Sequence, residues 1–219
     1  MKRIVAVFCA LFILLSFCAC APKLTDFERS GGTVIVYQAD SDLNAVLVIL
    51  EKRLHELGYE NTSAQIDGNI ITVIIPGRDA TYIAEDLSRA GHLTFRHSDG
   101  TVIMDNDMLT DVYADYVSNE VGNMTPVLYF NFTGEGQAAF AQATEIAAAN
   151  REGENVIDMY LDDDCIYSPR VEKPINENSC MVFMQGTPQD ELDMMAILIR
   201  CGKLPVTLDL INAEYHEPR

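Results

Sequence analysis

Short blocks of apolar residues along the chain predict alternating strands and helices. The β-branched run Thr33–Tyr37 is typical of a buried strand. After Asp42, apolar residues recur every three or four positions until Gly58, which predicts an amphipathic helix. The exposed face of this helix is expected to carry Glu51, Lys52, Arg53 and Glu56.

The next segment predicts a hairpin, a helix and a further strand. A strand around Thr62–Ile66 and the apolar run Ile70–Ile75 flank an Asp-Gly turn, which favours a hairpin. Asp79 can cap a second helix that ends at Gly91, before the short strand Leu93–His97. The resulting order of elements is that of a ferredoxin-like split β-α-β unit, so we expect an α+β fold.

The second half of the chain begins with a change in composition. Residues 98–123 are polar and acidic, which predicts a surface excursion with small irregular elements. Strands are then expected at Val127–Phe132 and Val156–Leu161, with a helix after Thr133 between them. Another helix is expected to begin with Thr187 as its cap and the following proline at its first position. The remaining predicted strands are Tyr167–Val171, Cys180–Met184 and Val206–Ile211.

The N-terminus has the layout of an export signal. Lys2 and Arg3 precede the apolar run Ile4–Leu15, and small residues follow it. Cys20 comes after an alanine, where the lipobox of bacterial lipoproteins places its lipid-modified cysteine, so lipidation of Cys20 is predicted. An uncleaved membrane anchor and a soluble secreted form are the alternatives. Each of them puts the body of the protein outside the cytoplasm.

The strongly acidic charge limits the partners of this chain. Its 219 residues include 15 Lys and Arg against 33 Asp and Glu, a net charge of -18. Nucleic acid is excluded as a partner, because phosphate binding needs a basic face. Anionic lipid head groups would repel the same surface, so attachment to a membrane has to come from the N-terminus.

Residues that support catalysis or metal binding elsewhere are scattered in this sequence. The run Asp162–Asp164 is acidic, but successive strand residues point to opposite faces and the spacing of a calcium loop is absent. The histidines lack zinc spacing, and no serine lies in a GxSxG motif. Cys165, Cys180 and Cys201 are expected to be buried free thiols. We therefore expect no metal, no cofactor and no catalytic residue.

Seven fragments rich in glycine and proline occur in a fixed order along the chain. They are Gly31-Gly32-Thr33, Arg53-Leu54 with Gly58, Ile75-Pro76-Gly77, Gly91–Phe95, Pro126–Thr144, Leu161–Gly186 and Leu198–Val206. In this order they resemble the large extracytoplasmic domain of SecD, a subunit family of the Sec protein-export machinery. The motif residues that the fold is expected to need are Gly31, Gly32, Pro76, Gly77, Gly91, Phe95, Phe140, Asp162, Pro169, Gly186, Gly202 and Pro205.

The resemblance implies a two-part body, a ferredoxin-like base with an inserted α+β head. The expected divisions are residues 1–20 for the signal peptide and lipobox, 21–30 for a linker, 31–97 plus 203–213 for the base, 98–123 for the surface excursion and 124–202 for the head. Asp163 stands where the family has a glycine, which puts the positive φ of that turn in question.

The resemblance also implies a role in protein export. In the family, this domain is thought to engage the emerging preprotein, while proton flow through further transmembrane helices drives its movement. We do not expect this chain to be a complete proton-driven subunit, because no apolar span follows Pro22. The expectation is a non-enzymatic, lipid-anchored accessory on the extracytoplasmic face of the cell membrane, which binds unfolded preprotein transiently and works with Sec translocase components.

The alternative is a lipoprotein that keeps the fold as a structural or small-ligand-binding module. A contiguous apolar groove in the head favours peptide handling, whereas a closed acidic surface favours the alternative. Phe183, Met184, Met194 and Met195 are candidates for exposed apolar side chains there, although core packing is their expected fate.

Overall fold

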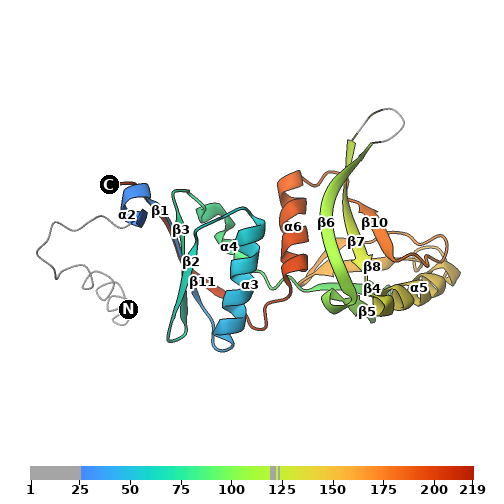
Figure 1. Cartoon of the computed structure of the whole chain (residues 1–219). Helices are drawn as coiled ribbons and strands as arrows, with labels where there is room; N and C mark the ends of the chain where they lie inside the picture. The colour runs from blue at the N-terminus through green and yellow to red at the C-terminus, as the bar shows by residue number, and fades with distance from the viewer. Residues whose placement is uncertain (1–25, 119–121, 123) are drawn as a thin grey trace, which may run out of the picture.

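The computed structural model describes residues 26–118, 122 and 124–219, which form an elongated body of two parts (Figure 1). The predicted signal segment and Cys20 lie outside the described residues. The part next to the C-terminus is the base, and it contains α2 (Asp26–Ser30), β1 (Gly32–Gln38), α3 (Leu43–Glu56), β2 (Ser63–Asp67), β3 (Ile70–Pro76), η1 (Thr81–Ile83), α4 (Ala84–Ser88) and β11 (Asp209–His216).

The other part is the head, which the chain forms between α4 and β11. Its elements are β4 (Leu93–His97), β5 (Val102–Asp105), η2 (Asn106–Met108), β6 (Leu109–Ser118), β7 (Met124–Phe132), α5 (Gly134–Ala149), β8 (Ile157–Leu161), β9 (Asp164–Tyr167), β10 (Ser179–Phe183) and α6 (Gln189–Cys201). Helix α6 lies on the side of the head that faces the base (Figure 1). Within the described residues, no helix is both long and apolar enough to cross a bilayer.

The base is an antiparallel sheet of order β11-β1-β3-β2, with α3 and α4 on one face (Figure 1). Strands β1 and β3 alternate buried and half-buried residues, because the period of two turns every second side chain toward the helices. Ile35 and Tyr37 of β1 pack there in one core with Val46 and Leu50 of α3. This order confirms the predicted ferredoxin-like base with an inserted head.

One strand was assigned to the wrong part by the sequence prediction. Leu93–His97 forms β4 as expected, but β4 pairs with β5 and β8 of the head and with no strand of the base. The place beside β1 belongs to β11, which starts later than the predicted strand Val206–Ile211. Leu208 contributed to the apolar signal of that strand, but it is buried in the base core from an irregular segment, as is Leu204 before it.

Within the described residues, the head contains two antiparallel sheets, β5-β4-β8-β9 and β10-β7-β6, and the long helices α5 and α6. The small irregular elements predicted for residues 98–123 are wrong for the described part of this range, which supplies β5 and the ten-residue strand β6, although most residues of β6 are half-buried or exposed. Met104 and Val112 of this segment are buried in the head core, whereas Val102 and Tyr116 are exposed. Phe95 lies at the centre of that core, edge-to-face with Phe130 and Phe140 at 5.5 and 5.9 Å between ring centroids.

Both long helices of the head begin close to the predicted residues. The Thr133 hydroxyl caps α5 by accepting a hydrogen bond from the Gly136 N–H at 3.0 Å, which confirms the predicted helix start. Helix α6 differs by one residue, since Pro188 occupies the cap position that was predicted for Thr187. Gly136 packs tightly against η2, where a Cβ atom would approach the Met108 carbonyl oxygen to 2.3 Å.

Replacing Gly136 with alanine tests this packing. Gly136→Ala forces α5 away from η2, and we expect it to lower the free energy of unfolding by about 1–3 kcal/mol, as overpacked cores do. Gly134→Ala is the matched control two residues earlier, because a Cβ at Gly134 meets no atom within 4 Å. Urea unfolding of both variants measures the difference, and equal midpoints for the two would contradict the close approach.

Candidate functional site

Strand β10 leaves one of its sides open. It lies at the edge of the sheet β10-β7-β6, and the Met184 N–H donates to the Pro126 carbonyl of β7 at 2.9 Å. Backbone groups alternate in direction along a strand, so Val182 also faces β7, whereas Met181 and Phe183 turn their N–H and C=O groups away from it. Within residues 26–118 and 124–219, no other strand pairs with that side. The head therefore presents an unpaired hydrogen-bonding edge.

A groove of about 190 Å³ lies beside this edge. Phe95 and Met159 are its most buried lining residues, and β10 forms one wall. The opposite wall comes from β8, β9 and the segment that follows β9. The complete lining is Phe95, Phe140, Ile157, Met159, Tyr167, Pro169, Arg170, Val171, Ile175, Cys180, Met181, Val182 and Phe183. The groove is smaller than the roughly 300–1,000 Å³ of typical small-molecule sites, and it has room for single apolar side chains.

The few polar groups of the groove do not support catalysis. Arg170 is engaged by Glu152 in an ion pair of 3.2 Å. Burial raises the pKa of the Cys180 thiol to about 12, so the thiol is protonated at neutral pH and is a poor nucleophile. Cys180 therefore contributes to the groove as a small apolar residue.

An apolar strip crosses the outer face of the same sheet. Met181 and Phe183 are 37% and 44% exposed on β10. Tyr129 of β7 lies opposite Met181, and Tyr113 of β6 lies opposite Tyr129. The two tyrosine rings stack at 4.9 Å between centroids. The strip thus leads from β6 across the sheet to the open edge.

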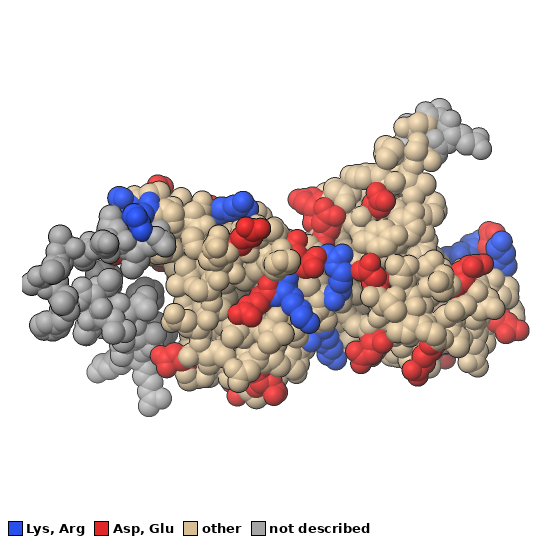
Figure 2. All heavy atoms as spheres, viewed as in Figure 1, with Lys and Arg blue, Asp and Glu red and all other residues tan. Residues whose placement is uncertain are grey.

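Negative charge surrounds this strip. Asp111 and Asp115 lie two residues before and after Tyr113 on β6 and share its face. Neither forms an ion pair with any described residue. Residues 93–201 contain 5 Lys and Arg against 19 Asp and Glu. Acidic side chains are spread over the head in the space-filling view, with few basic ones among them (Figure 2).

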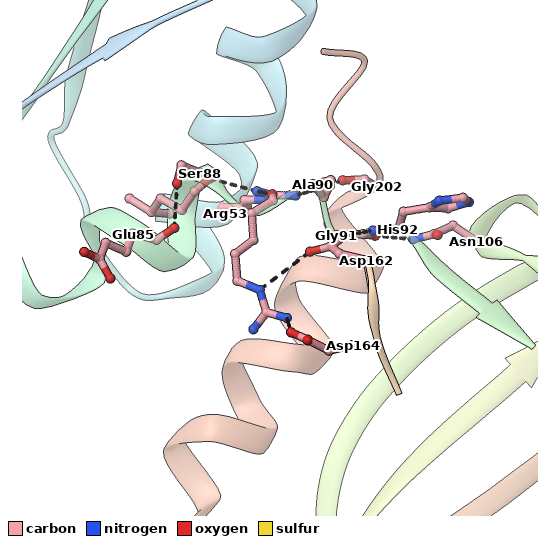
Figure 3. Close-up of polar contacts among 12 residues, drawn as sticks. Arg53, Glu85, Ser88, Ala90, Gly91, His92, Asn106, Asp162, Asp164 and Gly202 are labelled. Atoms are coloured by element: carbon pink, nitrogen blue, oxygen red, sulfur yellow. Dashed lines mark hydrogen bonds and ion pairs between the residues drawn. The ribbon is translucent and has the colours of Figure 1, made fainter. Parts of the chain in front are cut away.

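The head is joined to the base where two chain segments cross. The chain leaves the base through residues 89–92 and returns through residues 202–204. These two segments and the side chains that connect them form the joint between the base and the head. The Leu204 N–H donates to the Ala90 carbonyl at 2.8 Å, which ties the two segments together. The guanidinium of Arg53, from α3 of the base, reaches both of them (Figure 3).

Arg53 is fully buried and donates only to backbone carbonyls. Its Nη1 donates to Leu87 and Arg89 at 2.8 and 2.6 Å. Its Nη2 donates to Ala90 and Gly202 at 3.0 and 3.2 Å, whereas the buried Nε has no partner among the described residues. Burial lowers the pKa of Arg53 to about 10, with Cys201 and then Asp162 opposing the shift, so the side chain stays charged at neutral pH.

Backbone and side-chain contacts of Asp162 extend this joint into the head. The Asp162 carboxylate accepts from the His92 N–H at 2.8 Å, and the Asp162 N–H donates to the His92 carbonyl at 2.8 Å (Figure 3). Arg89 lies 3.6 Å from the same carboxylate and 4.0 Å from that of Asp164. The Asn106 side chain donates to Gly91 and to Ile199 of α6, at 2.9 and 3.0 Å.

A further bridge links the helices on either side of the joint. Arg200 of α6 forms an ion pair with Glu56 of α3 and donates to the Val112 carbonyl of β6 at 3.1 Å. Glu56 therefore connects the base, through one arginine, to the sheet that carries the open edge. Gly91 completes the joint, because its φ is +75° and a Cβ there would lie 2.6 Å from Arg53 Nη2.

The structure gathers most of the predicted motif residues into three places. Gly31, Gly32, Pro76 and Gly77 meet where β1 pairs with β3; Gly91, Asp162 and Gly202 surround the joint; and Phe95, Phe140 and Pro169 line the groove. Gly186 and Pro205 lie apart from these places in exposed turns. The positive φ of the turn after β8 belongs to Asp162, at 61°, because aspartate tolerates this conformation.

Arg53 was misplaced by the sequence prediction, which put it on the exposed face of its helix. Its side chain is 0% exposed. Arg53 follows Val46 by seven residues and Leu50 by three, so it continues the buried stripe of α3. That spacing was a usable signal, but a charged residue is normally expected in solvent.

The candidate apolar and sulfur-containing residues of the head have different environments. The expected core packing is wrong for Phe183, which is exposed, whereas it is confirmed for Met184 and Met195, which are buried in the head core. Met194 is partly buried against the base core. Cys201 is buried and Cys180 half-buried, but Cys165 is exposed, so the prediction of three buried thiols is wrong for Cys165. Among the described residues, no group of three or more His, Cys, Asp and Glu is placed to hold a metal ion.

The fold and the groove together define a class of protein: an α+β body whose ferredoxin-like base carries a head with an apolar groove. A family model described as the P1 head subdomain of SecDF matches residues 81–206. The chain therefore belongs to the SecDF P1 family. The matched range covers the groove, the open edge and both chain segments of the joint, whereas Arg53 and Glu56 lie before it.

Curated relatives and solved structures agree with this family. Protein translocase subunit SecD of Acidaminococcus fermentans is 28% identical over 84% of this chain and 45% of its own length. Protein-export membrane protein SecD of Methanopyrus kandleri is 27% identical over 83% of this chain and 48% of its own length. The chain thus spans about half the length of the curated relatives it matches.

The solved structures are similar in fold. The crystal structure of SecDF in its super-membrane-facing form has a TM-score of 0.70 at 20% identity, covering 98% of this chain and 35% of the other. A structure described as SecDF, a membrane component that enhances protein export, has a TM-score of 0.65 at 20% identity, covering 82% of this chain and 98% of the other. Both support the two-part α+β fold.

Removing the Arg53 guanidinium tests the joint. Arg53→Met leaves four carbonyl oxygens without their charged donor, and we expect the free energy of unfolding to fall by about 3 kcal/mol. Arg78→Met is the matched control, because Arg78 is exposed and lies over the Tyr59 ring at 5.7 Å. Denaturant unfolding measures both. Equal stability of the two variants would show that the buried guanidinium does not hold the joint.

Proposed function

We propose that this chain is an extracytoplasmic accessory of protein export whose head transiently binds unfolded polypeptide. The observation that carries the proposal is the apolar groove beside an open strand edge in a chain of the SecDF P1 family. An extended polypeptide can bind to both features, because its unpaired backbone groups can bond to the strand edge and its apolar side chains can enter the groove. A folded protein has already paired its backbone and buried most of those side chains.

The size of the groove is suited to weak and reversible binding. Burial of one large apolar side chain contributes about 1.5–3 kcal/mol. A dissociation constant of 1 mM corresponds to about 4 kcal/mol, so a few side chains and edge hydrogen bonds give only moderate affinity. Such binding allows a polypeptide to be held and released without unfolding of the head.

The groove favours this function over that of a small-ligand module. Its volume of about 190 Å³ is below that of typical small-molecule sites, and its lining is apolar on most sides. The exposed strip of Met181, Phe183, Tyr129 and Tyr113 extends the apolar surface beyond the groove. A long polypeptide can use this continuation, whereas a compact ligand cannot.

We also propose that the protein acts at the outer face of the cell membrane, next to Sec translocase components. Several relatives bear the names of translocase or protein-export subunits, and the N-terminal sequence has the layout of a lipoprotein signal. A lipid on Cys20 would tether the acidic body without contact between that body and anionic lipids.

Loss of the apolar strip is expected to weaken polypeptide binding. The double variant Met181→Ser, Phe183→Ser should bind a reduced and alkylated, permanently unfolded polypeptide about tenfold more weakly than the parent chain, because two exposed apolar contacts are lost. Ile211→Ser is the control, since Ile211 is 55% exposed on the base. Fluorescence anisotropy measures both. Binding by the parent no stronger than that of an inert acidic protein would refute the proposed function.

The anchor is tested at the N-terminus of the protein isolated from its own cells. Mass spectrometry should find a first residue of Cys20 that carries a diacylglycerol. Cys20→Ala should release the protein from the membrane fraction or leave its signal uncleaved. An intact Met1, or a chain that starts at Ala21 without lipid, would contradict lipidation.

A further inference from the structure

The two faces of β10 at its open edge have different chemical surroundings. All four residues from Cys180 to Phe183 border the groove, but their side chains alternate between two faces. Cys180 and Val182 pack on the core side with the groove, whereas Met181 and Phe183 are exposed on the outer face of the sheet. A strand added to this edge would place its own side chains alternately in the same two environments. One set would enter the apolar groove, and the other would lie beside the outer strip.

The two environments call for different side chains. The groove takes apolar groups, because its lining is apolar and its one arginine is paired with Glu152. The outer face is acidic, with unpaired Asp111 and Asp115 on β6 and exposed Glu177 two residues before β10. An added strand would lie three strand spacings from β6, roughly 14 Å. Lysine and arginine side chains are long, so those that extend across the sheet bring their positive charges closer to the carboxylates of β6.

The charge of the whole head acts in the same direction. Residues 93–201 have 5 basic against 19 acidic residues, whereas residues 26–92 have 5 against 11. The acidic excess is thus concentrated in the part of the chain that carries the groove. The negative electrostatic potential of the head raises the rate at which cationic segments associate with it and lowers that rate for acidic segments.

We infer that the head selects extended segments in which apolar and basic residues alternate, and that it binds them by strand addition to β10. This inference rests on the proposed function and specifies its substrate class and binding mode. The backbone N–H and C=O groups of Met181 and Phe183 supply the hydrogen bonds. The groove accepts the apolar side chains, and the acidic outer face accepts the basic ones.

Three synthetic peptides of equal length separate these contributions. The first alternates valine and lysine, the second alternates valine and glutamate, and the third is the lysine peptide with N-methyl groups on alternate backbone amides. The full chain should bind the lysine peptide about tenfold more tightly than either of the others at low salt. The preference over the glutamate peptide should shrink between about 50 and 300 mM salt, because charges separated by more than a Debye length of about 8–10 Å are screened.

Paired substitutions at one exposed residue test the charge in the protein. Met181→Lys and Met181→Glu remove the same apolar side chain, and both are tolerated at a position that is 37% exposed. Met181→Lys should weaken binding of the lysine peptide several-fold more than Met181→Glu does. An equal loss in both variants would assign the binding to apolar contact alone and overturn the charge selection.

The outcomes distinguish this inference from the proposed function. Binding of the unfolded polypeptide together with equal affinity for the lysine and glutamate peptides would leave the proposed function intact and refute the charge selection. Unchanged affinity of the N-methylated peptide would refute strand addition. Absence of binding to the unfolded polypeptide and to all three peptides would refute the proposed function itself.

Discussion

One buried guanidinium carries the connection between the two parts of this molecule. Arg53 belongs to the base, yet its donors are shared among carbonyls on both segments that lead into and out of the head. A charge taken out of water is strongly destabilising unless it is well hydrogen-bonded, and the four carbonyls meet that need. The arrangement also requires a glycine at position 91, since a Cβ there would collide with the guanidinium. Any change that separates the two crossing segments therefore exposes unsatisfied groups on both sides.

The joint allows the head to have a core of its own and still keep a defined place on the base. The aromatic cluster of Phe95, Phe130 and Phe140 stabilises the head from within, while Arg200 and Glu56 tie its helix α6 to the base. An exposed strand edge is normally a site of aggregation, and natural proteins protect such edges with charge. In this chain the acidic excess of the head supplies that protection. In our proposal, the same charge sets the preference of the open edge among extended partners.

Much of the fold could be predicted from local pattern. The glycines and prolines that end each element, the period of two in β1 and β3, and the Thr133 cap all act within a few residues, so their signals can be read along the chain. Strand pairing is not local, and it was there that the prediction failed. β4 has the sequence of a strand in either sheet, and only contacts with β5 and β8 assign it to the head. β6 was missed because its outward positions are polar and hide the alternation of an edge strand.

The sequence by itself determined the family resemblance, the α+β class and the acidic charge. These follow from residue identity and short-range spacing, which exist before the chain folds. Only the tertiary structure decided that Arg53 is buried, that β10 has an open side and that a groove lies next to it. Each of these depends on segments distant in sequence: the Arg53 acceptors lie up to 149 residues away, and the groove walls come from separate sheets. Such contacts arise from packing. The spacing along α3 marks the face on which Arg53 lies, but no local pattern identifies its acceptors, the open side of β10 or the groove.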